Sequence, residues 1–90
     1  MTITEIKERI EKNLGDGTSA KVEGLEGTTD HVQAFIVSPR FEKLSLVEAH
    51  RLVMGLFQEE IASNELHAFT FKTFTPEEWK RRTGIASPMR

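Results

Sequence analysis

The hydrophobic residues of this chain change their spacing several times, and this change limits the folds that the chain can adopt. Apolar residues recur at helical spacing over residues 3–14, which predicts an amphipathic helix. Apolar and polar residues then alternate over residues 19–25, which predicts a half-exposed strand. Residues 31–37 predict a second strand that is apolar on both faces near its end and therefore central in the sheet. A second helical pattern covers residues 45–61, and residues 67–74 alternate as a third strand.

Two short motifs mark the points where the later helices begin. Ser45 and Glu48 have the spacing of a capping box, in which each side chain binds the backbone amide of the other residue. Thr75 and Glu78 repeat that spacing, and a proline at the first helical position favours a helix start there. This last helix contains Trp79, whose ring is expected to fold back over the end of the sheet or over the long helix.

The order of elements is therefore α-β-β-α-β-α, which predicts an α+β domain with a three-stranded mixed sheet and helices on one face. A chain of 90 residues leaves no room for a second core, so residues 1–84 are expected to form a single domain. Residues 85–90 predict a flexible C-terminal tail.

The long helix is expected to turn one apolar stripe towards the sheet, with Glu59 and Glu60 towards solvent. His50 lies at the margin of that stripe, which favours a partly buried structural histidine. The stripe consists of Leu46, Ala49, Val53, Leu56, Phe57 and Ile61.

Composition excludes several classes of protein. Because the chain has no cysteine, it can form no disulfide, no thiolate nucleophile and no cysteine-based metal site of its own. Its 12 Lys and Arg against 14 Asp and Glu give a net charge of −2, without the positive excess of a dedicated nucleic-acid binder. No apolar run is long enough to cross a membrane, and the N-terminus has no signal-peptide pattern, so a cytoplasmic protein is expected.

The residues that could carry chemistry are few. His31, His50 and His67 share no metal-binding spacing, and the sequence has neither a nucleophile elbow nor a phosphate-binding loop. No nucleophile and base can be paired, so the chain is not expected to be an enzyme. His31 and His67 each open a predicted strand, where a histidine can fill the end of the core or project its ring from the sheet.

Three segments resemble the BolA-like protein family. The segment His67–Trp79 (HAFTFKTFTPEEW) is similar to the family ending HA-x-x-x-K-T-x-TP-x-x-W. Val37–Glu42 (VSPRFE) resembles its V-S-x-x-F-E segment, and His50–Val53 (HRLV) its H-R-L-V piece. The segments come in the order and spacing of the family and cover about residues 31 to 79. Lys43 stands where the family usually has glycine, and Ala49 where an arginine often occurs.

The resemblance implies a BolA fold, similar to a type II KH domain, and a partnership with a monothiol glutaredoxin of the CGFS type. It implies a [2Fe–2S] cluster shared with that glutaredoxin and glutathione, in iron–sulfur cluster trafficking, iron homeostasis or redox signalling. The ligand implied for this chain is His67, with His31 as the second. The isolated chain would bind no cluster and would be a monomer or a weak homodimer.

Cluster chemistry agrees with this implication. A cluster needs four ligands, and a chain without cysteine and with at best two placed histidines cannot hold a conventional one alone. Imidazole is protonated near pH 6.5 and then leaves the metal, so a cluster shared in this way should be sensitive to pH and transferable.

The resemblance also leaves a different class of function open, a DNA-binding transcriptional regulator of the BolA type in stress response and cell morphology. The net charge and Ala49 in place of an arginine weigh against it. Its phosphate contacts would be Lys43, Arg51, Lys72, Lys80, Arg81 and Arg82.

Overall fold

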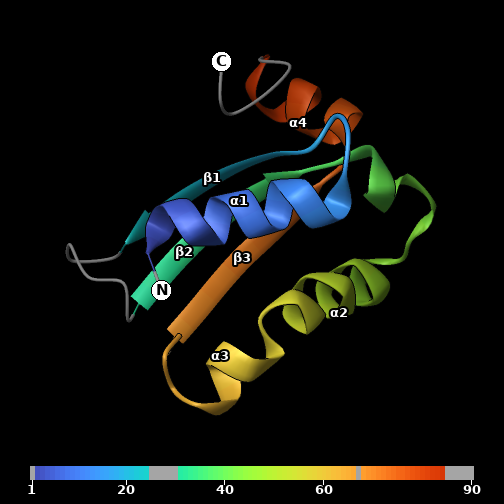
Figure 1. Cartoon of the computed structure of the whole chain (residues 1–90). Coiled ribbons are helices and arrows are strands. Elements are labelled where there is room, and N and C mark those ends of the chain that lie inside the picture. The colour runs from blue at the N-terminus through green and yellow to red at the C-terminus, as the bar shows by residue number, and fades with distance from the viewer. Residues whose placement is uncertain (1, 25–30, 67, 85–90) are drawn as a thin grey trace.

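The computed structural model describes residues 2–24, 31–66 and 68–84 (Figure 1). The predicted order of helices and strands is confirmed, and a short 3₁₀ helix, η2, is added after the second strand. The elements are α1 (Ile3–Leu14), β1 (Ser19–Gly24), β2 (His31–Val37), η2 (Pro39–Lys43), α2 (Leu46–Leu56), α3 (Gln58–Ala62), β3 (Ala68–Phe74) and α4 (Pro76–Thr83). Leu25 and His67, which the sequence places in the first and third strands, lie outside the described residues.

The sheet is mixed, as predicted, with the strand order β1-β2-β3. β1 and β2 are antiparallel, and Val22 pairs with Ala34. β2 and β3 are parallel, and Ala34 pairs with Phe71 on that side. β2 is therefore the central strand, and β1 and β3 are the two edges.

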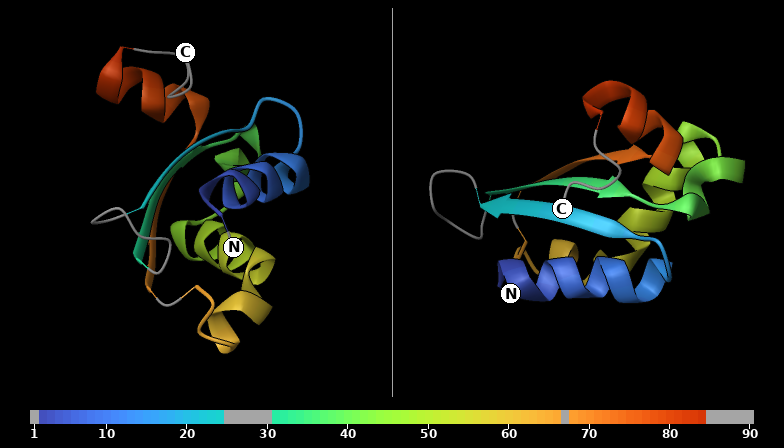
Figure 2. Two further views of the ribbon diagram at one scale, coloured as in Figure 1. Left: turned by 60° about the vertical axis from the view of Figure 1, so that its left-hand side comes forward. Right: turned by 90° about the horizontal axis from the view of Figure 1, so that it is seen from above.

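The helices lie on both sides of this sheet (Figure 2). The prediction that residues 3–14 and 45–61 pack on one face is confirmed, because α1, α2 and α3 lie together there. Val32, Ala34 and Ile36 of β2 belong to the core on this side and are fully buried. The last helix, α4, lies across the opposite face, so the expectation of helices on one face does not hold for α4.

Trp79 attaches α4 to that opposite face. Its ring centroid lies 5.0 Å from that of Phe74 at the end of β3 and 6.2 Å from that of Phe35 in β2. Only 8% of Trp79 is exposed. The expectation that the ring folds over the end of the sheet is confirmed, and it does so on the side away from α2.

The predicted continuous helix over residues 45–61 is wrong at Phe57, where the chain breaks into α2 and α3. Phe57 has φ −123° and ψ 20°, and its amide donates to the Met54 carbonyl, three residues back, at 3.1 Å. The break allows the ring of Phe57 to pack fully buried against β3, edge-on to Phe69 with centroids 5.2 Å apart. Burial of this large ring stabilises the broken form of the helix.

The beginning of α2 also departs from the predicted stripe. Leu46 is 76% exposed and Val47 is 58% exposed. His50, expected to be partly buried, is exposed, although its ring stacks on Phe71 with centroids 4.5 Å apart. The reason is that α2 lies beside β3, which is an edge strand, so the first turns of α2 have less of the sheet to pack against.

Gly55 offers a direct test of the α2 backbone. It lies inside a helix, its φ is not positive, and a Cβ at this position would meet no atom within 4 Å. Gly55→Ala is therefore expected to stabilise the fold by about 0.5–1 kcal/mol, because alanine loses less backbone freedom on folding. Urea unfolding of the two proteins measures this gain, and a loss of stability would contradict the helical backbone described for α2.

Arg9 connects α1 to the helices beside it. Its guanidinium donates to the Leu56 carbonyl at 3.0 Å and to Glu60 Oε1 at 2.8 Å. Glu60 is therefore half-buried, and the expectation that it faces solvent is wrong. The hydrogen bond from Arg9 lowers the pKa of the Glu60 carboxyl below its ordinary value.

This ion pair predicts a dependence of stability on pH. Because the folded pKa of Glu60 is lowered, its contribution is complete above the ordinary carboxyl pKa and is lost as the pH falls through the lowered value. Glu60→Gln should cost about 0.5–1 kcal/mol at neutral pH, with the difference shrinking as the pH falls below about 4. Glu59→Gln, at an exposed neighbour, is the control for urea unfolding at each pH. A cost that stays constant down to low pH would contradict the assignment.

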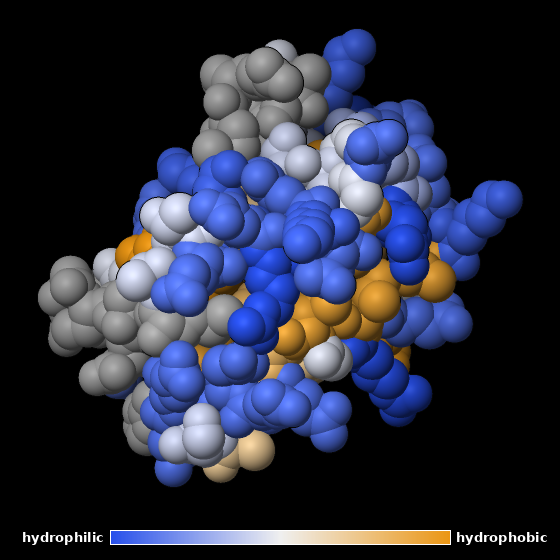
Figure 3. Space-filling model, in the orientation of Figure 1, coloured by the Kyte–Doolittle hydropathy of each residue, from blue (hydrophilic) through white to orange (hydrophobic). Residues whose placement is uncertain are grey.

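The core lies between the sheet and the layer of α1, α2 and α3. Ile6, Ile10 and Leu14 of α1 belong to it and are at most 2% exposed. Half-buried hydrophobic residues surround this core, and Figure 3 shows apolar surface between α1 and α2 on an otherwise polar face. No helix among the described residues has the length and apolar character needed to cross a bilayer.

Candidate functional site

The candidate metal-ligating position that the structure describes is His31, at the start of β2. The side chain of His31 is exposed. The parallel register pairs His31 with Ala68, the residue that follows His67 in the chain. His67 itself lies outside the described residues. The pairing of β2 with β3 thus brings the two strand starts that the sequence singled out to the same end of the sheet.

His31 lies on the face of the sheet that α1 and α2 do not cover. Side chains alternate along a strand, and Val32, Ala34 and Ile36 point into the core, so His31 and Gln33 point away from it. Gln33 pairs with Glu23 in β1 and with Thr70 in β3, and both are exposed. Within the part of the chain that the structure describes, His31 therefore lies on a face with exposed polar side chains of β1 and β3.

The chemistry available at this end of the sheet is that of an incomplete metal site. Imidazole binds iron through a neutral ring nitrogen, and an exposed ring is accessible to a metal brought by a partner. Within the described ranges, no group of three or more His, Cys, Asp or Glu side chains is arranged to hold a metal ion. A cluster bound here would need its remaining ligands from other molecules.

The cationic residues considered for DNA contacts are all exposed, but they do not share one surface. Arg51 lies on α2 and the cations of α4 lie on the opposite face of the sheet (Figure 2). Within α4, Arg81 approaches Glu77 at 4.0 Å, and the Arg82 guanidinium lies 5.5 Å from the centroid of the Phe74 ring. The remaining three are Lys43 at the end of η2, Lys72 on β3 and Lys80 on α4.

The two departures from the family pattern have little structural effect. Lys43 adopts no positive φ, so the turn at its position does not require glycine. Ala49 is 3% exposed and lines a cleft of about 200 Å³ together with Thr73 and Glu78. Position 49 belongs to the contact between α2 and the end of the sheet. Alanine at this position therefore does not remove a cation from an open surface.

Ser38, which belongs to the V-S-x-x-F-E segment, has a structural role that the sequence analysis did not assign. It is fully buried, and its hydroxyl shares a hydrogen bond of 2.9 Å with Thr18 and accepts from the Arg40 amide at 3.1 Å. Its own amide donates to the Phe74 carbonyl at 3.0 Å. Ser38 therefore ties the end of the central strand to both edges and starts η2. A serine directly before a proline is a signal that could have indicated this cap.

Comparisons with known proteins agree with this fold and these motifs. A sequence model of the family described as BolA-like protein matches residues 4–78. The acid stress protein IbaG of Escherichia coli (strain K12) is 33% identical over 72 residues, which cover 80% of this chain and 86% of IbaG. The DNA-binding transcriptional regulator BolA of Haemophilus influenzae is 37% identical over 54 residues, which cover 60% of this chain and about half, 52%, of that regulator.

Solved structures of related proteins also have the fold of this chain. A bol-like protein from Babesia bovis superimposes with a TM-score of 0.74 at 30% identity, covering 91% of this chain and 93% of that one. The relatives named above are a stress protein and a transcriptional regulator, and neither name describes an enzyme. The family match, the shared fold and these similarities lead to one conclusion: the chain belongs to the BolA-like protein family.

Proposed function

We propose that this protein is an adaptor that shares a [2Fe–2S] cluster with a monothiol CGFS glutaredoxin, in iron–sulfur cluster trafficking, iron homeostasis or redox signalling. The observation that carries the proposal is the parallel register of β2 and β3. It pairs exposed His31 with Ala68, next in the chain to His67, and so supports a joint role at one end of the sheet. Because positions 31 and 67 have opposite side parity, the two rings would have to meet beyond the strand ends.

The donor set of this chain fits a shared cluster better than one of its own. It offers imidazoles and no thiolate, so two thiolates would have to come from the glutaredoxin and from glutathione. Histidine ligands raise the reduction potential of such a cluster and make its retention dependent on pH. His67 and His31 would be the residues of this chain that hold it.

Anaerobic mixing tests the proposal. The protein is titrated into a CGFS glutaredoxin reconstituted with iron, sulfide and glutathione, and visible absorption and circular dichroism are recorded. We expect a new spectrum that saturates at a fixed ratio of the two proteins. If the spectrum stays that of the glutaredoxin alone, the shared cluster is excluded.

The alternative is a DNA-binding regulator, which the name of the Haemophilus influenzae relative supports. Lys80, Arg81 and Arg82 on α4 are exposed and would bind phosphates together with Lys72. Duplex binding measured at several salt concentrations tests this, because replacing one phosphate-binding cation should reduce the salt slope by about one. Binding that does not change on replacing the α4 cations by glutamine would remove this alternative.

A further inference from the structure

The outer edge of β3 is a surface that the proposed cluster does not use. In the strand order β1-β2-β3, only β2 pairs with β3. Within the described residues no strand lies against the other side of β3, so about half of its amide and carbonyl groups point outwards. Such an edge can accept one more strand.

α2 and α3 supply a wall beside this edge. His50 stacks on Phe71 of β3, and Met54 follows His50 at four-residue spacing on the same side of α2. Gln58, the first residue of α3, lines one recess together with Met54. Arg9 of α1 binds the Leu56 carbonyl and Glu60, which places α1 on the other side of these helices. The side of α2 that carries His50 and Met54 therefore borders the edge of β3.

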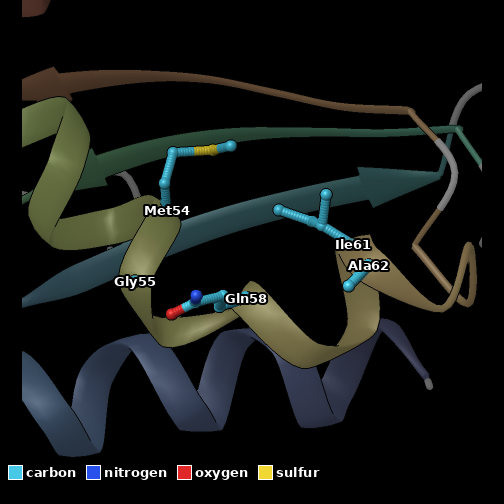
Figure 4. A pocket seen from close by; sticks show the side chains of 5 residues that line it. All are labelled: Met54, Gly55, Gln58, Ile61 and Ala62. Carbon is cyan, nitrogen blue, oxygen red and sulfur yellow. The ribbon is translucent and has the colours of Figure 1, made fainter.

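Two apolar recesses lie one after the other along this wall. The first, of about 370 Å³, lies between α2 and the second half of β3. It is lined by Leu46, His50, Phe71, Lys72, Thr73 and Phe74. The second, also of about 370 Å³, lies where α2 meets α3, and Figure 4 shows Met54 and Ile61 extending from the helices towards the strand layer there. It is lined by Met54, Gly55, Gln58, Ile61 and Ala62. We call the β3 edge with these two recesses the edge groove.

The spacing of the recesses matches an extended chain. Leu46 in the first recess and Met54 in the second are eight residues apart on α2, which corresponds to about 12 Å along a helix. Residues i and i+4 of a strand lie about 13 Å apart and point to the same face. A strand added to β3 would thus place two side chains of one face, at positions i and i+4, in the two recesses.

The charges at the groove indicate what the other side chains should be. Lys72 lines the first recess, is exposed, and forms no ion pair with any residue that the structure describes. It points to the face opposite the core-facing Phe71, where the intervening residues of an added strand would lie. An acidic residue between the two apolar ones would pair with Lys72 across the strands.

We propose that the edge groove binds an extended segment of a partner protein, which adds a fourth strand to β3. The segment carries apolar side chains at positions i and i+4 for the two recesses and an acidic side chain between them for Lys72. The exposed Leu46, 76% of which is open to solvent in the isolated chain, would be covered by this segment. A single-stranded nucleic acid fits the groove less well, because Lys72 is the only cation among the residues that line the two recesses.

Fluorescence anisotropy with designed peptides tests this proposal on the full chain, without iron or glutaredoxin. The probes are labelled peptides of about eight residues with Leu, Val or Phe at positions i and i+4 and Glu at positions i+1 and i+3, which point to the face of Lys72. We expect the best of them to bind with a Kd of about 10–100 μM. Of two versions of this peptide, with proline at i+2 or at i+3, one should bind at least about tenfold more weakly, because successive amides of a strand point to opposite sides and only one of these two donates to β3.

Two matched variants locate the binding. Leu46→Glu puts a charge into the first recess and should weaken binding by about tenfold or more. Val47→Glu makes the same change at an adjacent exposed residue that lines neither recess, and should leave the Kd within about twofold. Both glutamates lie in the first turn of α2, where a negative charge favours the helix, so both variants should fold.

The proposal is overturned if no peptide of the panel binds with a Kd below about 1 mM. It is equally overturned if Leu46→Glu and Val47→Glu weaken binding alike, because the peptide then does not lie in the groove. Competition by an oligothymidylate that binds more tightly than any peptide would assign the groove to nucleic acid instead. Slower hydrogen exchange of β3 amides in the peptide complex would support strand addition.

Discussion

His67→Ala is expected to abolish the spectrum that appears when this protein joins a glutaredoxin-bound cluster, and to leave the fold nearly unchanged. A ligand must present a neutral ring nitrogen to the partner, and a ring that is open to a partner contributes little packing. Visible circular dichroism of the anaerobic mixture should return to that of the glutaredoxin alone. The unfolding midpoint of the isolated variant should lie close to that of the parent protein.

Two further histidine variants test whether the loss of the spectrum is specific to His67. His31→Ala should weaken the cluster without erasing it, because water or a neighbouring group can take the second ligand position. His50→Ala should keep the spectrum, since His50 lies beside the later half of β3, away from the end of the sheet that holds His31. Because His50 is exposed, the loss of stability should be limited to its stack on Phe71. If His67→Ala unfolds the domain and its folded fraction still gives the parent spectrum, His67 is a core residue.

Trp79→Ala is expected to cost about 3–5 kcal/mol of folding stability, the range for removal of a buried aromatic ring. Trp79 lies against Phe74 and Phe35 and is the buried residue by which α4 packs on the sheet. Chemical unfolding followed by far-ultraviolet circular dichroism measures the cost, since this signal does not depend on the removed indole.

The control for this variant is Lys80→Ala, at the next and exposed position of α4, which should change stability by no more than about 0.5 kcal/mol. An unfolding midpoint of Trp79→Ala close to that of the parent protein would show that the ring contributes little to the fold. The packing described for α4 would then be wrong.

The sequence predicted the elements whose signals are local. Ser45 with Glu48 and Thr75 with Glu78 form the predicted capping boxes, and the structure adds a third, Thr2 with Glu5, at the start of α1. Helix starts of this kind depend on residues three apart, so they can be recognised without knowledge of the rest of the molecule.

The features that the sequence did not predict depend on distant contacts. The helix breaks at Phe57 because its ring packs on Phe69, twelve residues further along the chain. Leu46 is open because β3 is an edge strand, and hydrophobic spacing does not reveal the strand order of a sheet. The resemblance implied His67 and His31 as joint ligands, but the register that pairs His31 with Ala68 came from the structure.

The parallel pairing of β2 with β3 also affects the order in which the molecule can assemble. His31 and its partner Ala68 are 37 residues apart (68 − 31), whereas Gly24 and Val32 of the β1–β2 ladder are 8 apart (32 − 24). Closing the longer loop costs more chain entropy, so β3 should join the sheet after the β1–β2 hairpin has formed. The histidine end of the sheet and the edge groove both require β3 in place. A nascent or partly unfolded chain would therefore present neither surface. A partner that binds either surface would bind only after folding is complete.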